Sequence, residues 1–239
     1  MVKSIITLLV LFLIAFTTIA QELPEKAPVE VEAGDGLVLK GDFYAQPEGS
    51  VGILLLHMNN SDRNGWSAFI PYLLEAGYSV LAVDIRGFGQ TGGTRAFELA
   101  QTDVQTWLDW LKSQENIIGI AVMGASVGSN LGLVGCANDP DCLGVVALSP
   151  GEDFMGIQPA DAIQNGLTDR PILIVGSHGD RESASAVREF AQIATGVFTL
   201  QLYPRSQHGT GYFIGLGADE KMTFFVQWLT DNIIVPEEE

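Results

Sequence analysis

Short apolar runs alternate along the chain with longer segments in which apolar positions recur at helical spacing. The short runs have the length of buried parallel strands, and they cover residues 51–56, 79–83, 117–123, 145–148, 172–175 and 197–203. The longer segments predict helices, and they cover residues 66–76, 96–113, 126–136, 183–194 and 218–232. This alternation favours an α/β fold in which helices cover both faces of a mostly parallel central sheet.

A β-hairpin is expected ahead of these elements. Residues 29–32 and 37–44 have strand character, and the turn sequence Ala-Gly-Asp-Gly at 33–36 separates them. The ligands of open parallel sheets gather at the carboxyl ends of the strands. Catalytic side chains are therefore expected directly after strands.

The first twenty residues have the anatomy of a secretory signal peptide. Lys3 precedes an apolar stretch at 5–16, and the small residues Thr18 and Ala20 suit cleavage after Ala20. The alternative is an uncleaved membrane anchor, although the apolar run is shorter than the roughly 20 residues that a spanning helix needs. Cleavage predicts a secreted or periplasmic protein without stable membrane association.

The remaining residues are expected to form one domain. We place a flexible segment at 21–27, a single domain at 28–235 and an acidic tail at 236–239. Acidic residues outnumber basic ones 29 to 12. This excess disfavours nucleic acids and anionic membrane surfaces as partners.

Two cysteines, Cys136 and Cys142, lie close together in the sequence. In an oxidising compartment this spacing predicts a disulfide that ties the end of one helix to the next strand. The alternative is a pair of buried free thiols.

The candidate nucleophile is Ser126, in the sequence Gly-Ala-Ser-Val-Gly at 124–128. An apolar strand precedes this pattern and a helix follows it. A sharp turn between strand and helix exposes a serine hydroxyl, and the glycines prevent clashes there. The alternative is a glycine-rich turn that holds an incidental serine.

A serine nucleophile needs a histidine base and a carboxylate behind that base. The chain order serine, acid, histidine selects His208 as the base and Asp180 as the acid. Glu182 is the second candidate for the acid. Asp180 has the alternative role of capping the helix that follows it, and His208 that of a surface loop residue.

Acyl transfer also requires two backbone N–H groups that bind the developing oxyanion. One is expected from Val127, at the start of the helix after Ser126, and the other from the loop at 57–66. His57, Arg63 and Trp66 in this loop are candidates for the substrate pocket. Asp84 and Arg86 are expected to form a structural pair in a later turn.

Three segments resemble α/β-hydrolase-fold serine hydrolases, especially dienelactone-hydrolase-like proteins and small esterases. They are residues 55–57 with Ser61 and Trp66, residues 83–91, and the histidine loop at 203–209. The resemblance implies that Asn59 is the second oxyanion donor, ahead of Met58. Met58 stands where the family usually has glycine, which suggests a narrower acyl side of the pocket.

The connection at 151–170 is too short for a large cap, so we expect an open cleft with Phe154, Met155 and Ile157 as a small apolar wall. The sequence predicts a carboxylesterase that acts on short to medium acyl esters, with a small-molecule ester as substrate. No metal or organic cofactor is expected. The alternatives are a polyester or cell-wall ester hydrolase, a lactone hydrolase, a peptidase, and a non-catalytic binding protein on the same scaffold.

Overall fold

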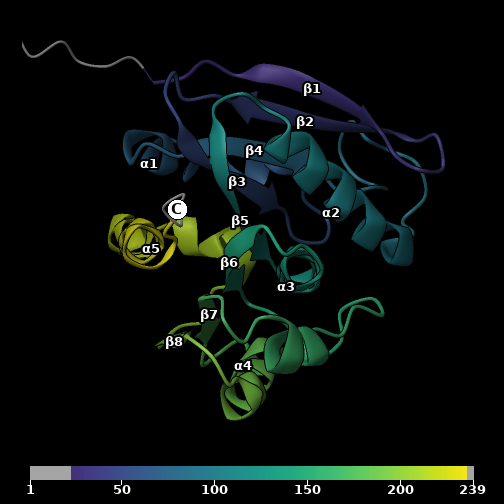
Figure 1. The fold of residues 1–239 in the computed structure, drawn as a ribbon. Coiled ribbons are helices and arrows are strands. Elements are labelled where there is room, and N and C mark those ends of the chain that lie inside the picture. Colours follow the sequence, from purple (N-terminus) through teal and green to yellow (C-terminus); the bar gives the residue numbers. More distant parts are fainter. Residues whose placement is uncertain (1–22, 236–239) are drawn as a thin grey trace, which may run out of the picture.

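The computed structural model describes residues 23–235, so the predicted signal peptide and the tail at 236–239 lie outside the described residues. Within this range the chain forms an eight-stranded sheet in the order β1-β2-β4-β3-β5-β6-β7-β8 (Figure 1). The strands are β1 Ala27–Glu32, β2 Val38–Tyr44, β3 Ser50–Leu56, β4 Ser79–Asp84, β5 Ile117–Ala125, β6 Cys142–Leu148, β7 Ile172–Ser177 and β8 Phe198–Tyr203.

Only the first part of the sheet is antiparallel. β1 pairs with β2, and β2 pairs with β4, in antiparallel register, whereas the remaining neighbours are parallel. The β1–β2 hairpin is confirmed, and its turn closes with a 2.8 Å hydrogen bond from the Ala33 N–H to the Leu37 carbonyl. β1 begins at Ala27, one residue before the predicted start of the domain.

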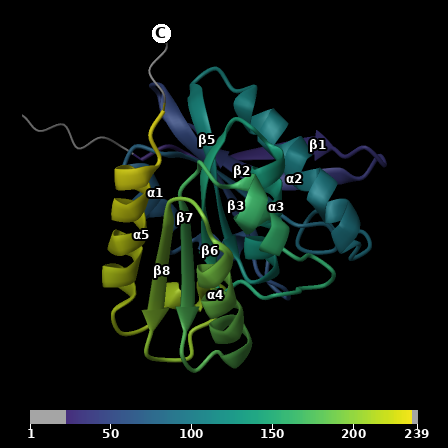
Figure 2. The ribbon, with the colours of Figure 1, turned by 60° about the horizontal axis from the view of Figure 1, so that its bottom comes forward.

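Helices cover both faces of the sheet, as the sequence pattern predicts. α1 (Ile70–Glu75) and α5 (Ala218–Asn232) lie on one face, and α2 (Phe97–Lys112), α3 (Val127–Asn138) and α4 (Arg181–Ile193) lie on the other (Figure 2). Each face buries its own apolar layer. Trp107, Leu131 and Phe190 belong to one layer, and Phe69 and Phe225 belong to the other. Among the helices of residues 23–235, none is long and apolar enough to cross a membrane.

The first predicted helix is shorter than the sequence pattern indicates. The segment expected at 66–76 forms a short 3-10 helix at Arg63–Trp66, and α1 then begins at Ile70. Pro71 lies in the first turn of α1. Proline lacks the N–H that would continue a helix backwards, so it favours a helix start at this point.

The predicted disulfide is confirmed. Cys136 lies near the end of α3, and its bond to Cys142 ties that helix to the first residue of β6. β6 begins three residues earlier than the apolar run indicates.

The segment between β6 and β7 contains no large cap domain, as predicted. Its regular structure is an isolated bridge between Phe154 and Ile157 and a π-helical turn at Ala162–Gly166. The connection between these two strands therefore adds no large domain to the sheet.

Candidate active site

Ser126 occupies a sharp turn between β5 and α3. Its backbone has φ +54°, a left-handed conformation that is uncommon for a residue other than glycine. The flanking glycines are required by close packing, because a Cβ at Gly124 would lie 2.1 Å from the Gly128 carbonyl oxygen and one at Gly128 would lie 2.3 Å from that of Leu56. The serine is thus held in a strained turn at the N-terminus of a helix.

His208 and Asp180 come together from two loops that follow adjacent strands, β8 and β7. Nδ1 of His208 lies 2.6 Å from Oδ2 of Asp180. Asp180 precedes α4, but its side chain makes no capping hydrogen bond to that helix. A carboxylate only accepts hydrogen bonds, so the contact assigns a proton to Nδ1 of His208 and leaves Nε2 as the basic nitrogen.

A single cavity of about 510 Å³ joins the candidate nucleophile to the candidate base. It is lined by Met58, Asn59, Asn60, Ser126, Val127, Asp153, Phe154, Met155, Glu182 and His208. The structure thus brings Ser126 and His208 together at the carboxyl ends of the strands. Asn59 and Met58, the two candidate oxyanion donors, also lie at this cavity. They belong to the loop at 57–62 between β3 and the 3-10 helix, which we call the oxyanion loop.

The buried ring of His57 holds the backbone of the oxyanion loop through hydrogen bonds. The Ile85 N–H donates to Nε2 of His57 over 3.0 Å, so the ring proton must reside on Nδ1, which lies 2.8 Å from the Met58 carbonyl oxygen. The carbonyl of one residue and the N–H of the next point in opposite directions across a trans peptide. Because Met58 directs its carbonyl toward His57, the Asn59 N–H points away from that ring.

The side chain of Met58 fills the space between the oxyanion loop and the histidine loop. Its sulfur accepts a hydrogen bond from Oγ1 of Thr210 at 3.8 Å. A Cβ on Gly209 would lie 2.8 Å from the same sulfur. Met58, which stands where the resembled proteins usually have glycine, therefore packs against the loop that carries His208.

A family model for the alpha/beta hydrolase fold matches residues 52–205. The chain belongs to the α/β-hydrolase family. Its curated relatives include an uncharacterised protein of Mycobacterium tuberculosis, 31% identical over 111 residues, which are 45% of this chain and 40% of the relative. An uncharacterised protein of Salmonella typhi is 27% identical over 127 residues, 48% of this chain and 44% of the relative. The match thus spans less than half the length of each.

Solved structures of α/β-hydrolases superimpose on most of the chain. A Pyrococcus furiosus esterase has a TM-score of 0.77 at 19% identity, over 88% of this chain and 92% of its own. A dienelactone hydrolase of Anabaena variabilis has a TM-score of 0.75 at 20% identity, over 89% and 100%. Est1E of Butyrivibrio proteoclasticus, solved with bound ferulic acid, has a TM-score of 0.74 at 16% identity, over 86% of this chain and 99% of its own. At these identities the likeness shows the fold alone.

Three side chains expected at the substrate pocket lie elsewhere in this hydrolase. His57, Arg63 and Trp66 are all buried, and none of them lines the cavity at Ser126. The indole of Trp66 packs against Phe213 at a ring separation of 5.5 Å. The side chains of these three residues therefore belong to the buried interior and not to the wall of the cavity.

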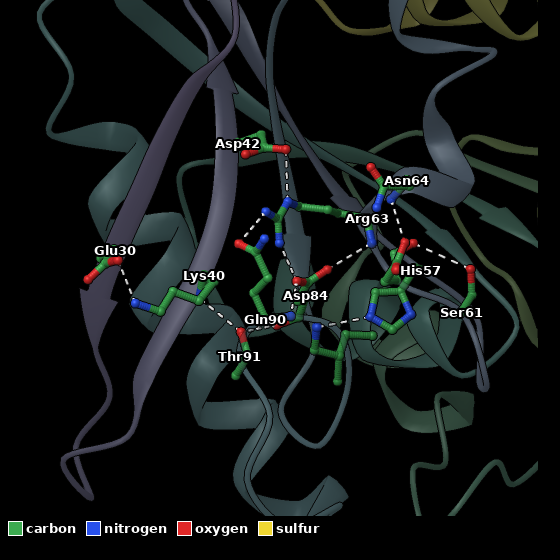
Figure 3. Close-up of polar contacts among 12 residues, drawn as sticks. Glu30, Lys40, Asp42, His57, Ser61, Arg63, Asn64, Asp84, Gln90 and Thr91 are labelled. Carbon is green, nitrogen blue, oxygen red and sulfur yellow. Dashed lines mark hydrogen bonds and ion pairs between the residues drawn. The ribbon is translucent and has the colours of Figure 1, made fainter.

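Arg63 forms a buried ion-pair network, shown in Figure 3. Its guanidinium donates to Asp42 on β2 at 2.8 Å and to Asp84 at the end of β4. A third contact, 2.8 Å long, reaches Oε1 of Gln90. The network joins the oxyanion loop to two strands and to the β4–α2 loop.

This network also corrects the expected pairing of Asp84 with Arg86. The partner of Asp84 is Arg63, whereas Arg86 donates to Asp103 on α2 and to Asp35 in the β1–β2 turn. These two carboxylates raise the pKa of Arg86 above its ordinary value. Sequence spacing favoured the nearer arginine, but the tertiary fold brings Asp103 and Asp35 to Arg86 and brings Arg63 to Asp84.

Sequence reasoning did not find two groups that hold the site together. Oγ of Ser149, after β6, accepts a 3.1 Å hydrogen bond from the Gly209 N–H and so fixes the loop of His208. Asn130, buried on α3, bonds the backbone of Gly151 and Ile157. The sequence signal for Ser149 was its position directly after a strand. Asn130 had no specific signal, because a polar residue inside an apolar helix can have many roles.

Within residues 23–235, no group of three or more histidine, cysteine, aspartate or glutamate side chains could hold a metal ion. That the hydrolase needs no metal or organic cofactor stays a prediction.

Proposed function

We propose that this protein is a secreted or periplasmic serine hydrolase that cleaves short to medium acyl carboxylic esters. The observation that carries the proposal is the arrangement of His208, whose Nδ1 binds Asp180 while the same ring lines the cavity of Ser126. Asp180 holds the imidazole in the tautomer that presents Nε2 as a base. Family membership and the short cap region support the same conclusion.

The reaction would begin when Nε2 of His208 takes the proton of the Ser126 hydroxyl and the oxygen attacks the ester carbonyl carbon. The carbonyl oxygen becomes an oxyanion, bound by the backbone N–H groups of Val127 and Asn59. Collapse breaks the bond to the alcohol, which leaves with the proton from His208. Water then adds to the acyl-enzyme with His208 as base, and the acid and free Ser126 are released.

Asn59 is preferred to Met58 as the second oxyanion donor because of the hydrogen bond between His57 and the Met58 carbonyl. This bond turns the Asn59 N–H away from the core, and Asn59 lines the cavity. Val127 is the first residue of α3, so its N–H is one of the groups without a partner inside the helix. The helix dipole adds partial positive charge at that point.

The activity can be tested with a series of nitrophenyl esters from acetate to octanoate. We expect burst kinetics and the highest kcat/KM with short to medium chains. Ser126→Ala should lower kcat by roughly 10⁴-fold or more, whereas Ser185→Ala, at an exposed serine on α4, should retain wild-type rates. Ester hydrolysis that survives in Ser126→Ala would contradict the assignment.

Secretion would remove the predicted signal peptide. The measurement is the intact mass and the N-terminal sequence of the protein expressed with its leader, and the expected first residue is Gln21. A mature protein that still begins at Met1 would contradict this part of the proposal.

A further inference from the structure

A small hairpin stands beside the catalytic cavity in the segment between β6 and β7. The Phe154 N–H donates to the Ile157 carbonyl at 3.2 Å, and the Ile157 N–H returns a 3.0 Å bond to Phe154. The two residues between them, Met155 and Gly156, have φ values of +57° and +84°. Positive φ at both central positions is the signature of a type I′ turn.

The base of this hairpin is fixed to the helix that carries the nucleophile. The side-chain amide of Asn130, on α3, donates to the carbonyls of Gly151 and Ile157 at 2.9 and 2.7 Å and accepts the Gly151 N–H at 3.1 Å. A further bond of 2.7 Å runs from the Gly156 N–H to Oδ1 of Asp153. The hairpin is therefore anchored at its base and braced across its turn, so its tip is held in one position.

Met155 is an unfavourable residue for the place that it occupies. Type I′ turns prefer Asn-Gly, since a side chain other than that of asparagine, aspartate or glycine strains the left-handed backbone. The thioether gains little from burial in the free protein, because Met155 is 55% exposed. A strained, exposed apolar residue at a candidate active site points to a functional role.

The tip of the hairpin faces the proposed reaction centre. Phe154 and Met155 both line the cavity with Ser126 and His208, and the ring centre of Phe154 lies 6.3 Å from that of His208. Ile157, expected in the same apolar wall, is instead buried in the core. Two apolar side chains thus stand at the mouth of the cavity.

We propose that the tip of this hairpin is the wall that binds the apolar chain of the ester, with Met155 as its specificity-determining residue. The proposal rests on the proposed function. A chain that extends from the carbonyl carbon at Ser126 would remove the thioether of Met155 and the face of Phe154 from water. The strained turn places the methionine where only bound substrate covers it.

The test is Met155→Asn, which restores the preferred Asn-Gly turn and removes the apolar side chain. Relief of strain should raise Tm by roughly 2–4 °C. The ratio of kcat/KM for nitrophenyl hexanoate to that for nitrophenyl acetate should fall roughly five-fold, as expected when one or two methylene groups lose their contact. A second series, acetate esters of longer alcohols, shows whether the acyl or the alcohol chain occupies the wall.

Two controls separate this role from a general effect on the protein. Met155→Leu retains an apolar side chain and the strained turn, so it should keep the chain-length ratio within two-fold and gain no stability. Leu216→Asn, at an 84% exposed residue outside the catalytic cavity, should leave the ratio unchanged.

An unchanged ratio in both ester series for Met155→Asn would overturn the proposal, as would a lower Tm for that variant. If the wild-type protein hydrolyses no ester and Ser126 does not react with a fluorophosphonate, the proposed function itself fails. The two failures are therefore distinguishable.

Discussion

The histidines of this chain show how hydrogen-bond partners decide what one residue type can do. His208 bonds a carboxylate through Nδ1, which leaves a basic nitrogen at the cavity. His57 accepts a backbone N–H at Nε2 and donates to a carbonyl through Nδ1, so both of its nitrogens are occupied. Burial also lowers the pKa of His57 below its ordinary value of about 6.5. We conclude that His57 acts as a neutral positioning residue.

This environment predicts a pH dependence of stability. Because the pKa of His57 is lower in the folded protein than in the unfolded chain, the unfolded chain binds an extra proton as the pH falls. The stability that neutral His57 supplies is complete above about pH 6.5 and is lost progressively below it. The Tm of His57→Gln should be lower at pH 7.5 but should fall less between pH 7.5 and 5.5. His178→Gln, at an exposed histidine, should keep the wild-type slope, and an equal slope in His57→Gln would contradict the interpretation.

Asp180 offers a second test at the residue scale. Asp180→Asn should retain the fold but lower kcat by roughly 10³–10⁴-fold, because an amide does not enforce the tautomer with a proton on Nδ1. Glu182→Gln, at the other candidate acid, should retain activity on uncharged esters within a few-fold. Steady-state kinetics with nitrophenyl acetate would check both. A larger loss of kcat for Glu182→Gln than for Asp180→Asn would show that Glu182, and not Asp180, is the acid.

Among the elements, the oxyanion loop is held in place by contacts with buried residues of neighbouring strands. Arg63 begins the 3-10 helix after this loop and links it to Asp42 on β2 and Asp84 on β4 (Figure 3). Both carboxylates are nearly inaccessible to solvent. Without the arginine Asp84 would lose its ionic partner, and Asp42 would keep only the exposed Lys26, 3.4 Å away. Loss of a partner from a buried ion pair is far more costly than loss of an exposed ion pair.

Arg63→Met should therefore lower the free energy of unfolding by roughly 3–5 kcal/mol. It should also reduce kcat/KM for esters in the fraction that remains folded, because the loop that holds Asn59 loses a support. Denaturant unfolding and ester kinetics are the measurements. Arg188→Met, at an exposed arginine on α4, should change stability by less than about 1 kcal/mol. A small effect for Arg63→Met would show that the network does not support the loop.

The disulfide also stabilises the arrangement of elements, since it joins α3 to β6. A closed loop as short as that between Cys136 and Cys142 is expected to contribute about 2 kcal/mol through the entropy of the unfolded chain. Replacement of both cysteines by alanine should lower Tm by roughly 4–8 °C. Activity below the new Tm should persist, because neither cysteine lines the cavity at Ser126. Equal Tm values for the two proteins would contradict this prediction.

A structural feature can be predicted from the sequence when the residues that determine it lie close together along the chain. The turn at Ser126 follows from a local pattern, and chain order suffices to select Asp180 and His208. The partner of Arg63 could not be predicted, because several carboxylates were available and only the strand order places Asp42 and Asp84 beside it. The roles of Ser149 and Asn130 are not encoded locally either, since their partners lie at least 21 residues away.

On the scale of the whole molecule, charge is distributed in a way that bears on substrate choice. The full chain has a formal net charge of −17. Asp153 and Glu182 line the cavity, and among its lining residues there is neither lysine nor arginine. This field attracts cationic substrates and repels anionic ones, and the effect is screened by salt.

We expect a choline ester to have a higher kcat/KM than its uncharged carbon isostere, by roughly two- to five-fold at low ionic strength. The ratio should approach one in high salt. Glu182→Gln should lower it, and Glu48→Gln, at an exposed glutamate before β3, should not. A ratio that is unaffected by both salt and Glu182→Gln would show that the carboxylates at the cavity do not select substrate.

We propose Ser126 as an activated nucleophile. The most direct measurement is reaction of the folded protein with a fluorophosphonate, followed by mass spectrometry of the intact protein and of its peptides. A single stoichiometric adduct on Ser126 is expected, formed much more slowly in His208→Ala and not at all in Ser126→Ala. No adduct on the folded protein, or one on another serine, would contradict the account and favour a non-catalytic scaffold.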